Sequence, residues 1–161
     1  MTIVTFRSLQ ISDAPALSEL LKSSPPEYIQ YFHPFPFEAA VLEDLISEAK
    51  KDCFVAVEAN HGRNDELAGF YMLRGLDEGY PAPMYGVFIA HKYRNNGLGL
   101  LTLIHAEASC RLSQIDRLML KVNPKNEFAK KLYQAHGFTT LREDPKNQNL
   151  LMEKSLVRDG D

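Results

Sequence analysis

The 161-residue chain has the usual size of one domain, and its 45% apolar and 24% charged residues are typical of an ordinary globular protein. No run approaches the roughly 18 apolar residues of a membrane-spanning helix, and the N-terminus lacks the pattern of a secretory signal. The net charge of −3 without a basic block disfavours nucleic-acid binding through broad phosphate neutralisation. Cys53 and Cys110 offer neither a disulfide framework nor metal-ligand spacing. We therefore expect a reduced, cytoplasmic protein with no bound metal and no membrane or nucleic-acid partner, in which both cysteines are small buried residues.

The first part of the chain predicts one strand and two helices. A short strand is expected over residues 3–6. Ser12–Asp13 then offers an N-cap oxygen to a helix that ends before the prolines at 25 and 26. A second helix is expected from 37 to 51, because apolar residues recur there at helical spacing.

Three strand patterns follow, at residues 53–57, 67–73 and 84–90. The first two are separated by the turn-rich segment 60–65, which predicts a hairpin with a long loop.

The second half predicts two helices, over residues 97–112 and 126–136, the latter ended by Gly137 in the position that favours a left-handed residue. The expected inner face of the longer helix has apolar residues at steps of three and four: Leu98, Leu101, Ile104, Ala108 and Leu112. The shorter helix would bury Phe128, Ala129 and Leu132. Further strands are expected at 118–122, 138–141 and 150–156.

This order of elements mixes hairpins with strand–helix–strand crossovers. It predicts one α+β domain over residues 1–161, with α/β/α layers built on a mixed sheet. A purely parallel, doubly wound sheet does not fit the order.

The segment from Val87 to Leu100 is the most informative in the chain. A strand ends near Ala90, a polar turn follows, and a long helix begins at Gly97 and Gly99. Such a turn presents unpaired backbone N–H groups beside the positive end of the helix dipole. Glycine matters there because a Cβ would hold a phosphate away from the backbone. The segment is therefore a candidate pyrophosphate site, although Gly-x-Gly alone is equally compatible with a helix start that binds nothing.

The wider pattern, Arg94-x-x-Gly97-x-Gly99 after Val-Phe-Ile, resembles the acetyl-CoA-binding motif of the GCN5-related N-acetyltransferase (GNAT) family. A second stretch looks like another signature of that family, in Asn126, Ala129, Leu132–Tyr133 and Gly137–Phe138. The resemblance spans nearly the whole chain. It implies a mostly antiparallel sheet in which two central parallel strands splay apart and helices flank both faces.

The resemblance also implies how acetyl-CoA binds. Its pantetheine arm would pair with backbone groups of Val87, Phe88 and Ile89, as an added strand does. Its pyrophosphate would lie on the main-chain amides that follow Arg94, namely those of Asn95, Asn96, Gly97, Leu98, Gly99 and Leu100. Asn126 would lie against the cofactor arm. From the residues alone, Asn126 is equally a helix cap, or a first-turn residue of a helix opened by Asn123–Pro124.

By the same resemblance, a neutral primary amine attacks the thioester directly. Tyr133 would protonate the departing thiolate, and a backbone N–H near Ile89 would stabilise the oxyanion. Tyr133 is also readable as an ordinary residue of an amphipathic helix. The sequence identifies no general base, and a water chain to solvent would suffice.

The acceptor is expected to be a small-molecule or peptide amine. Segment 25–37 is dense in prolines and aromatics, and we expect Tyr28, Tyr31 and His33 to wall the acceptor pocket. The alternative is that the segment only covers the core. His91 reads as a solvated turn residue, and edge strands of this family often pair into homodimers.

Two other interpretations compete. A dinucleotide-binding fold would need a third glycine where Thr102 stands and an acid ending the next strand, whereas Asp116 precedes that strand. A member of the same fold could instead bind acetyl-CoA as a non-catalytic sensor. Release of CoA thiol in the presence of an amine would separate the sensor from the enzyme.

Overall fold

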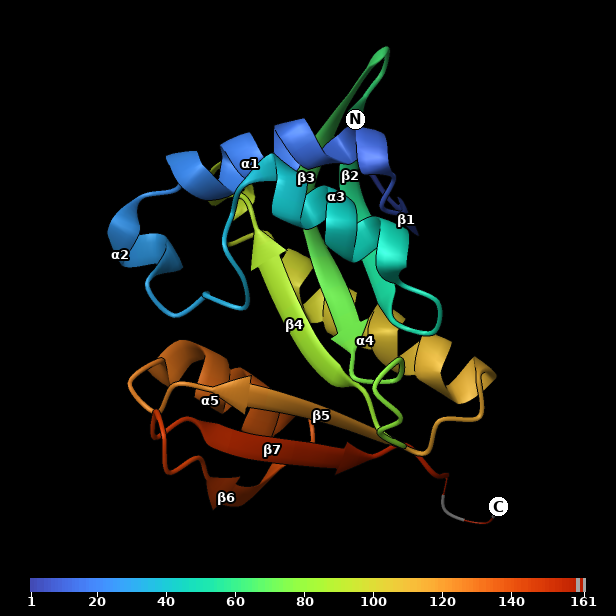
Figure 1. Ribbon diagram of the computed structural model, residues 1–161, viewed down its shortest axis with the longest axis vertical. Coiled ribbons are helices and arrows are strands. Elements are labelled where there is room, and N and C mark those ends of the chain that lie inside the picture. Colours follow the sequence, from blue (N-terminus) through green and yellow to red (C-terminus); the bar gives the residue numbers. More distant parts are fainter. Residues whose placement is uncertain (159, 161) are drawn as a thin grey trace.

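The computed structural model describes residues 1–158 and 160, and its centre is a seven-stranded sheet in the order β1-β2-β3-β4-β5-β7-β6. Every neighbouring pair of strands is antiparallel except β4 and β5, which run parallel. Helices cover both faces of the sheet (Figure 1). The predicted α+β fold with a mixed, mostly antiparallel sheet is therefore confirmed.

The strands that form the sheet are β1 (Ile3–Ser8), β2 (Cys53–His61), β3 (Asn64–Arg74), β4 (Met84–Ile89), β5 (Arg117–Val122), β6 (Thr139–Glu143) and β7 (Leu150–Ser155). The α-helices are α1 (Ala14–Ser23), α2 (Pro26–Ile29), α3 (Ala39–Glu48), α4 (Leu98–Leu112) and α5 (Glu127–Ala135). Two single-turn 3₁₀ helices, η1 (Ile11–Asp13) and η2 (His91–Tyr93), precede α1 and α4.

The two larger of three hydrophobic clusters lie on opposite faces of the sheet, and the third comprises Val57, Ala59, Ala68 and Leu98. On the first face, α1 and α3 bury Leu17, Leu21 and Leu42 against strand residues such as Phe70. On the second face, α4, α5 and the C-terminal strands enclose the larger core, which includes the following side chains: Tyr71, Leu73, Tyr85, Leu103, Ala106, Leu118, Leu120, Tyr133, Phe138 and Met152. The sheet is thus anchored from both sides, and its central strands are held in place at the positions where they separate.

The predicted inner face of α4 was wrong except at Leu98. Leu101, Ile104, Ala108 and Leu112 are exposed, whereas the helix buries the following residues: Leu98, Thr102, Leu103, Ala106, Glu107 and Cys110. The helix is apolar on nearly every side, so its periodicity does not select a face. In this orientation the buried carboxylate of Glu107 is compensated, because Lys154 of β7 reaches it at 2.8 Å and Arg111 at 3.4 Å.

The N-terminal region differs from the expectation in three details. Asp13 does not cap α1 with its side chain; its carboxylate binds the Arg7 guanidinium through two hydrogen bonds of 2.7 and 2.8 Å. A bidentate, charge-assisted pair outweighs one neutral cap bond. The prolines do end α1, but Pro26 then opens the four-residue helix α2. Pro36 and Glu38 delay the start of α3 until Ala39.

The hairpin between β2 and β3 is tighter than expected. Both strands continue into the segment expected to form the loop, and the turn closes at Gly62, whose φ is +74°. A left-handed glycine of this kind allows a short turn.

Three residues complete the comparison. Cys110 is buried as expected, but Cys53 is exposed at the start of β2. Phe128 is not an inner residue of α5, because 79% of its surface is exposed. No helix among the described residues is long and apolar enough to cross a membrane.

Candidate active site

The central feature of the site is the separation of β4 from β5. The two strands pair only at Met84 with Met119 and at Tyr85 with Leu120, after which they diverge (Figure 1). The unpaired part of β4 therefore presents a free backbone edge toward the gap.

Hydrogen-bond alternation identifies which residues supply that edge. The Pro83 carbonyl accepts from Met119 N–H on the β5 side, whereas Ala90 N–H donates to Ala68 on the β3 side. Because β4 pairs with β3 in unbroken register, successive residues alternate between the two sides. The backbone groups of Val87 and Ile89 consequently face the gap, and those of Phe88 face β3. An extended ligand arm would find its partners at Val87 and Ile89.

The glycine turn lies directly beyond this edge. After η2, Asn95 and Gly97 adopt left-handed conformations with φ of +62° and +78°, and Gly97 is the N-cap of α4. The Asn96 side chain braces the turn by donating to the Tyr93 and Arg94 carbonyls at 3.1 and 3.0 Å. The first turn of α4 contains no acidic residue. Its free N–H groups and helix dipole make this a candidate anion site.

The space beside the two glycines is open. A Cβ built on Gly97 or on Gly99 meets no atom within 4 Å. Neither glycine is therefore required by packing against the protein. Gly97 is required by its positive φ, whereas Gly99 has helical geometry and leaves room for a ligand to approach its backbone.

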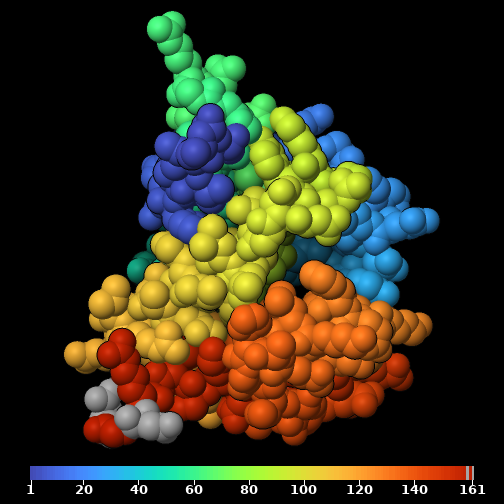
Figure 2. Space-filling model, turned by 180° about the vertical axis from the view of Figure 1, so that it is seen from behind, coloured from blue at the N-terminus to red at the C-terminus, as the bar shows by residue number. Residues whose placement is uncertain are grey.

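A cavity of about 700 Å³ joins the turn to the gap. Ten of the residues expected to bind the cofactor line it: Val87, Phe88, Ile89, Arg94, Asn95, Gly97, Leu98, Gly99, Leu100 and Asn126. The other expected residue, Asn96, is not among the lining residues and supports the turn from behind. Figure 2 shows the surface hollowed where the yellow-green segment after β4, the blue segment around α2 and the orange α5 meet.

Asn126 has the capping role that the sequence left open. Its side-chain oxygen accepts from Ala129 N–H at 3.3 Å, which makes it the N-cap of α5. Asn123 does not open the helix; its side chain accepts from Lys125 N–H instead. Because the Asn126 oxygen is used by the cap, its amide NH₂ is the group free to contact a ligand.

Tyr133 lies on α5 and reaches the same cavity. Only 9% of the residue is exposed, and burial raises the pKa of its phenol to about 12. The phenol is therefore fully protonated at neutral pH and is available as a proton donor. Tyr85, its aromatic neighbour, instead has a hydroxyl bonded to Thr102 at 2.8 Å.

The aromatic segment divides between cavity and core. Tyr28 and Tyr31 line the cavity, but His33 is not among its lining residues and stacks on Phe37. Phe32, Phe35 and Phe37 pack against the first core, as the alternative interpretation of this segment expected. The structure thus brings two of the three expected acceptor residues to the site.

Several lining residues were missed by the sequence analysis, among them Glu27, Tyr85, Lys121, Asn123 and Phe128. Lys121 and Asn123 lie at the end of β5 and just beyond it. Their place opposite the glycine turn follows once the two parallel strands are known to diverge. Phe128 was assigned to the core because its helix is amphipathic, although no signal at that position separates a core residue from a cavity residue.

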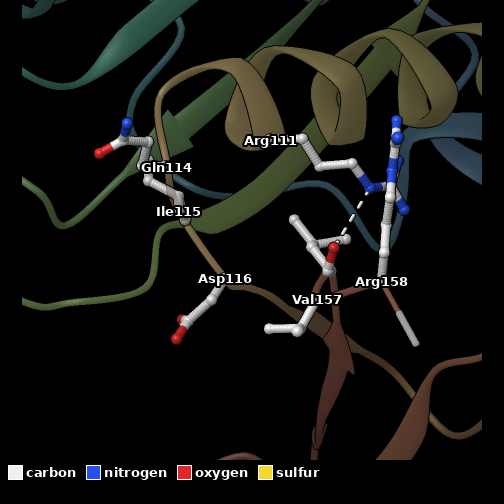
Figure 3. A pocket seen from close by; sticks show the side chains of 7 residues that line it. Arg111, Gln114, Ile115, Asp116, Val157 and Arg158 are labelled. Carbon is white, nitrogen blue, oxygen red and sulfur yellow. Dashed lines mark hydrogen bonds between the residues drawn. The ribbon is translucent and has the colours of Figure 1, made fainter. Parts of the chain in front are cut away.

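A second, smaller hollow of about 200 Å³ lies between the end of α4 and the C-terminal segment (Figure 3). There Arg111 donates to the Leu156 carbonyl at 3.3 Å. None of the expected site residues lines this hollow. Among the described residues, no group of three or more His, Cys, Asp or Glu is arranged to hold a metal.

Solved structures share this architecture. The PaiA N-acetyltransferase from Thermoplasma acidophilum, in complex with coenzyme A, is 19% identical and superposes with a TM-score of 0.74, covering 95% of this chain and 99% of its own. The spermidine N-acetyltransferase from Vibrio cholerae, in complex with CoA and spermine, is 18% identical with a TM-score of 0.77, covering 95% of both chains. The ribosomal-protein-S18-alanine N-acetyltransferase from Escherichia coli is 17% identical with a TM-score of 0.71, covering 99% and 97%. The fold is therefore that of N-acetyltransferases.

The family follows from the sequence. The model of the acetyltransferase (GNAT) family matches residues 14–138, and the chain belongs to this family. A comparison with curated proteins found no match.

Proposed function

We propose that this protein is an N-acetyltransferase that moves the acetyl group of acetyl-CoA to a primary amine of a small molecule or peptide by direct attack. The observation that carries the proposal is that a single cavity is lined by the glycine turn, the unpaired edge of β4 and Tyr133. These are an anion site, a surface for an extended amide-bearing arm and a proton donor, in one connected space.

The residues present fit acetyl-CoA. The open space beside Gly97 and Gly99 would admit a pyrophosphate to the N–H groups of the α4 N-terminus. Arg94, which is exposed and lines the cavity, would add a positive charge. Val87 and Ile89 would pair with the two amides of the pantetheine arm, and Asn126 would donate from its side-chain NH₂. When bound, acetyl-CoA supplies the acetyl group as an activated thioester.

Tyr133 would donate the proton that the departing thiolate requires. A phenol pKa of about 12 keeps the donor protonated, although it widens the mismatch with a thiol of pKa about 8.5. A CoA thiol held in the same buried surroundings would also have a raised pKa, so the difference between the pKa values of the phenol and the thiol would become smaller again. A gap-facing N–H of Val87 or Ile89 would stabilise the negative charge on the carbonyl oxygen.

The acceptor half of the cavity favours an amine with one positive charge and a flat apolar part. Tyr28, Tyr31 and Phe32 provide aromatic surface, and Glu27 is the one carboxylate among the described lining residues. The Lys121 ammonium, on the opposite side, pairs with Asp144 at 3.4 Å. A single carboxylate among aromatic rings can pair with one ammonium group, and the described lining residues offer no second carboxylate for a further ammonium group of a polyamine. The similar enzymes named above act on a polyamine or on an alanine of a ribosomal protein, so amine acceptors of different size suit this fold.

The test is an amine screen with the purified protein. We expect acetyl-CoA to bind without an acceptor, and CoA thiol to be released only when a suitable amine is added. Acetylated product would be identified by mass spectrometry, with arylalkylamines, amino sugars, polyamines and peptide N-termini as the panel.

Two results would contradict the proposal in different ways. Binding of acetyl-CoA without thiol release for any amine would favour the non-catalytic sensor. Failure to bind acetyl-CoA at all would contradict the assignment of the cavity itself.

A further inference from the structure

The Tyr28 hydroxyl occupies a backbone group of the free β4 edge. It donates to the Ile89 carbonyl at 2.5 Å, across 61 positions of sequence. The ring is held in place by His91, which it meets edge to face with centroids 5.0 Å apart. Ile89 is one of the two residues whose backbone faces the gap, so this hydrogen bond lies on the ligand side of the strand.

This contact competes with the proposed use of the edge. An extended arm that runs from the glycine turn toward Tyr133 must pass Ile89, the gap-facing residue closest to the turn in sequence. Its amide N–H would seek the same carbonyl oxygen that the phenol holds. Burial raises the pKa of the Tyr28 phenol, so the group remains a donor throughout the neutral range.

We propose that Tyr28 is an internal ligand of the cofactor groove, which satisfies the Ile89 carbonyl in the free protein and is displaced by a pantetheine amide when acetyl-CoA binds. The proposal rests on the proposed function, because it assumes that the arm lies along β4. It goes beyond that function by naming the Tyr28 hydroxyl as the group that the cofactor replaces on the Ile89 carbonyl.

Displacement of Tyr28 has a consequence for the acceptor. Tyr28 belongs to α2, a helix of only four residues, and the same segment carries Glu27, Tyr31 and Phe32 into the cavity. Release of the phenol therefore moves or frees the wall that faces the acceptor. Since coupling between two sites is reciprocal, an acceptor that binds better to the rearranged wall would raise the affinity for acetyl-CoA by the same factor.

The substitution Tyr28→Phe tests the exchange directly, because it keeps the ring and its contact with His91 but removes the hydroxyl. Losing a competing hydrogen bond should tighten acetyl-CoA binding about three- to tenfold by calorimetry. Tyr80→Phe removes an exposed phenol outside the cavity and should leave the affinity unchanged. Thermal unfolding of each variant verifies that it is folded.

Unchanged or weaker binding in folded Tyr28→Phe overturns the proposal, because the hydroxyl would then be neutral or helpful to the cofactor. A wild-type protein that does not bind acetyl-CoA contradicts the proposed function instead, so the two failures are distinguishable. As a second readout, hydrogen exchange at residues 26–31 should quicken when acetyl-CoA is added without an acceptor. Slower hydrogen exchange there would mean that the segment closes onto the cofactor with Tyr28 in place. That result would also overturn the proposed displacement of Tyr28.

Discussion

Tyr133 and Tyr85 meet edge to face in the cavity, with ring centroids 6.5 Å apart and planes at 85°. Their hydroxyls are used differently. That of Tyr85 is bonded to Thr102, whereas that of Tyr133 makes no hydrogen bond to any residue within the described part of the chain. A tyrosine hydroxyl that borders a ligand cavity and has no protein partner is suited to act on the ligand.

Replacing Tyr133 with Phe should therefore lower turnover with little effect on the fold. The ring and its packing remain, and only the proton is lost. We expect kcat to fall roughly a hundredfold while the melting temperature changes little. Tyr71→Phe is the matched control, because it removes a hydroxyl that binds His105 at 2.7 Å and does not line the cavity. Near-normal turnover in Tyr133→Phe would show that water protonates the thiolate.

The pKa of Tyr133 also fixes the expected pH dependence. Tyr133 acts in its protonated form, and burial raises its pKa to about 12, so this form is lost only as pH rises toward 12. The amine must be neutral to attack, and ordinary primary amines lose their proton near pH 10. We expect kcat/KM to rise with pH up to about 10 and to show no fall from Tyr133 below about pH 11. A descending limb near pH 9 that disappears in Tyr133→Phe would contradict the raised pKa of Tyr133.

Gly99 offers a clean test of the phosphate site. It lies in the first turn of α4, where a Cβ meets no protein atom, so Gly99→Val should fold. The added side chain would occupy the space of the bound pyrophosphate and should weaken acetyl-CoA binding at least about thirtyfold, or about 2 kcal/mol. Gly97→Val is less informative, because a φ of +78° strains a β-branched residue. Ala108→Val, on the exposed side of the same helix, controls for β-branching. Equal affinities in the two Val variants would place the pyrophosphate elsewhere.

The sequence pattern around residues 87–100 predicted those parts of the candidate site that are formed by main-chain groups. A strand, a polar turn and two glycines before a helix indicated a candidate anion site, and the structure has the strand, the turn and the helix start at Gly97 in that order. The divergence of β4 from β5 could be expected only from the family resemblance, because no residue in either strand encodes it locally.

The relationships that sequence could not reveal are those between distant side chains. The hydrogen bond from Tyr28 to the Ile89 carbonyl joins α2 to β4, which lies far along the chain. With four residues, α2 is too short to show helical periodicity in the sequence. The burial of Glu107 on α4 is accompanied by its ion pair with Lys154, which no pattern within the helix predicts. Phe128 satisfies the period of α5 but faces solvent and cavity, because a ligand surface and a core face have the same composition.

The division of the aromatic segment predicts unequal effects of two substitutions. Tyr31 lines the cavity and 40% of it is exposed, whereas His33 stacks on Phe37 away from the cavity. Tyr31→Ala should raise the KM for the acceptor about tenfold, without changing acetyl-CoA affinity, because it removes one aromatic wall. His33→Ala should leave that KM unchanged. Steady-state kinetics with the best amine from the screen measures both, and equal effects of the two variants would argue against this boundary of the pocket.

The buried charges of α4 give the largest expected effect on stability. Glu107 is 7% exposed and depends on Lys154 at 2.8 Å, since Arg111 reaches it only at 3.4 Å. Lys154→Met keeps an unbranched apolar stem but leaves the carboxylate without its nearest cation. Breaking a buried pair in this way costs about 3 kcal/mol or more, measurable by urea unfolding.

Lys130→Met provides the comparison, because its partner Glu127 is exposed and such surface pairs contribute less than about 1 kcal/mol. The double variant Glu107→Gln with Lys154→Met should recover part of the loss, since the amide carries no charge to desolvate. If Lys154→Met were no less stable than Lys130→Met, the orientation of α4 would have to depend on apolar packing alone. That outcome would leave unexplained why a helix with exposed Leu101 and Ile104 buries a glutamate instead.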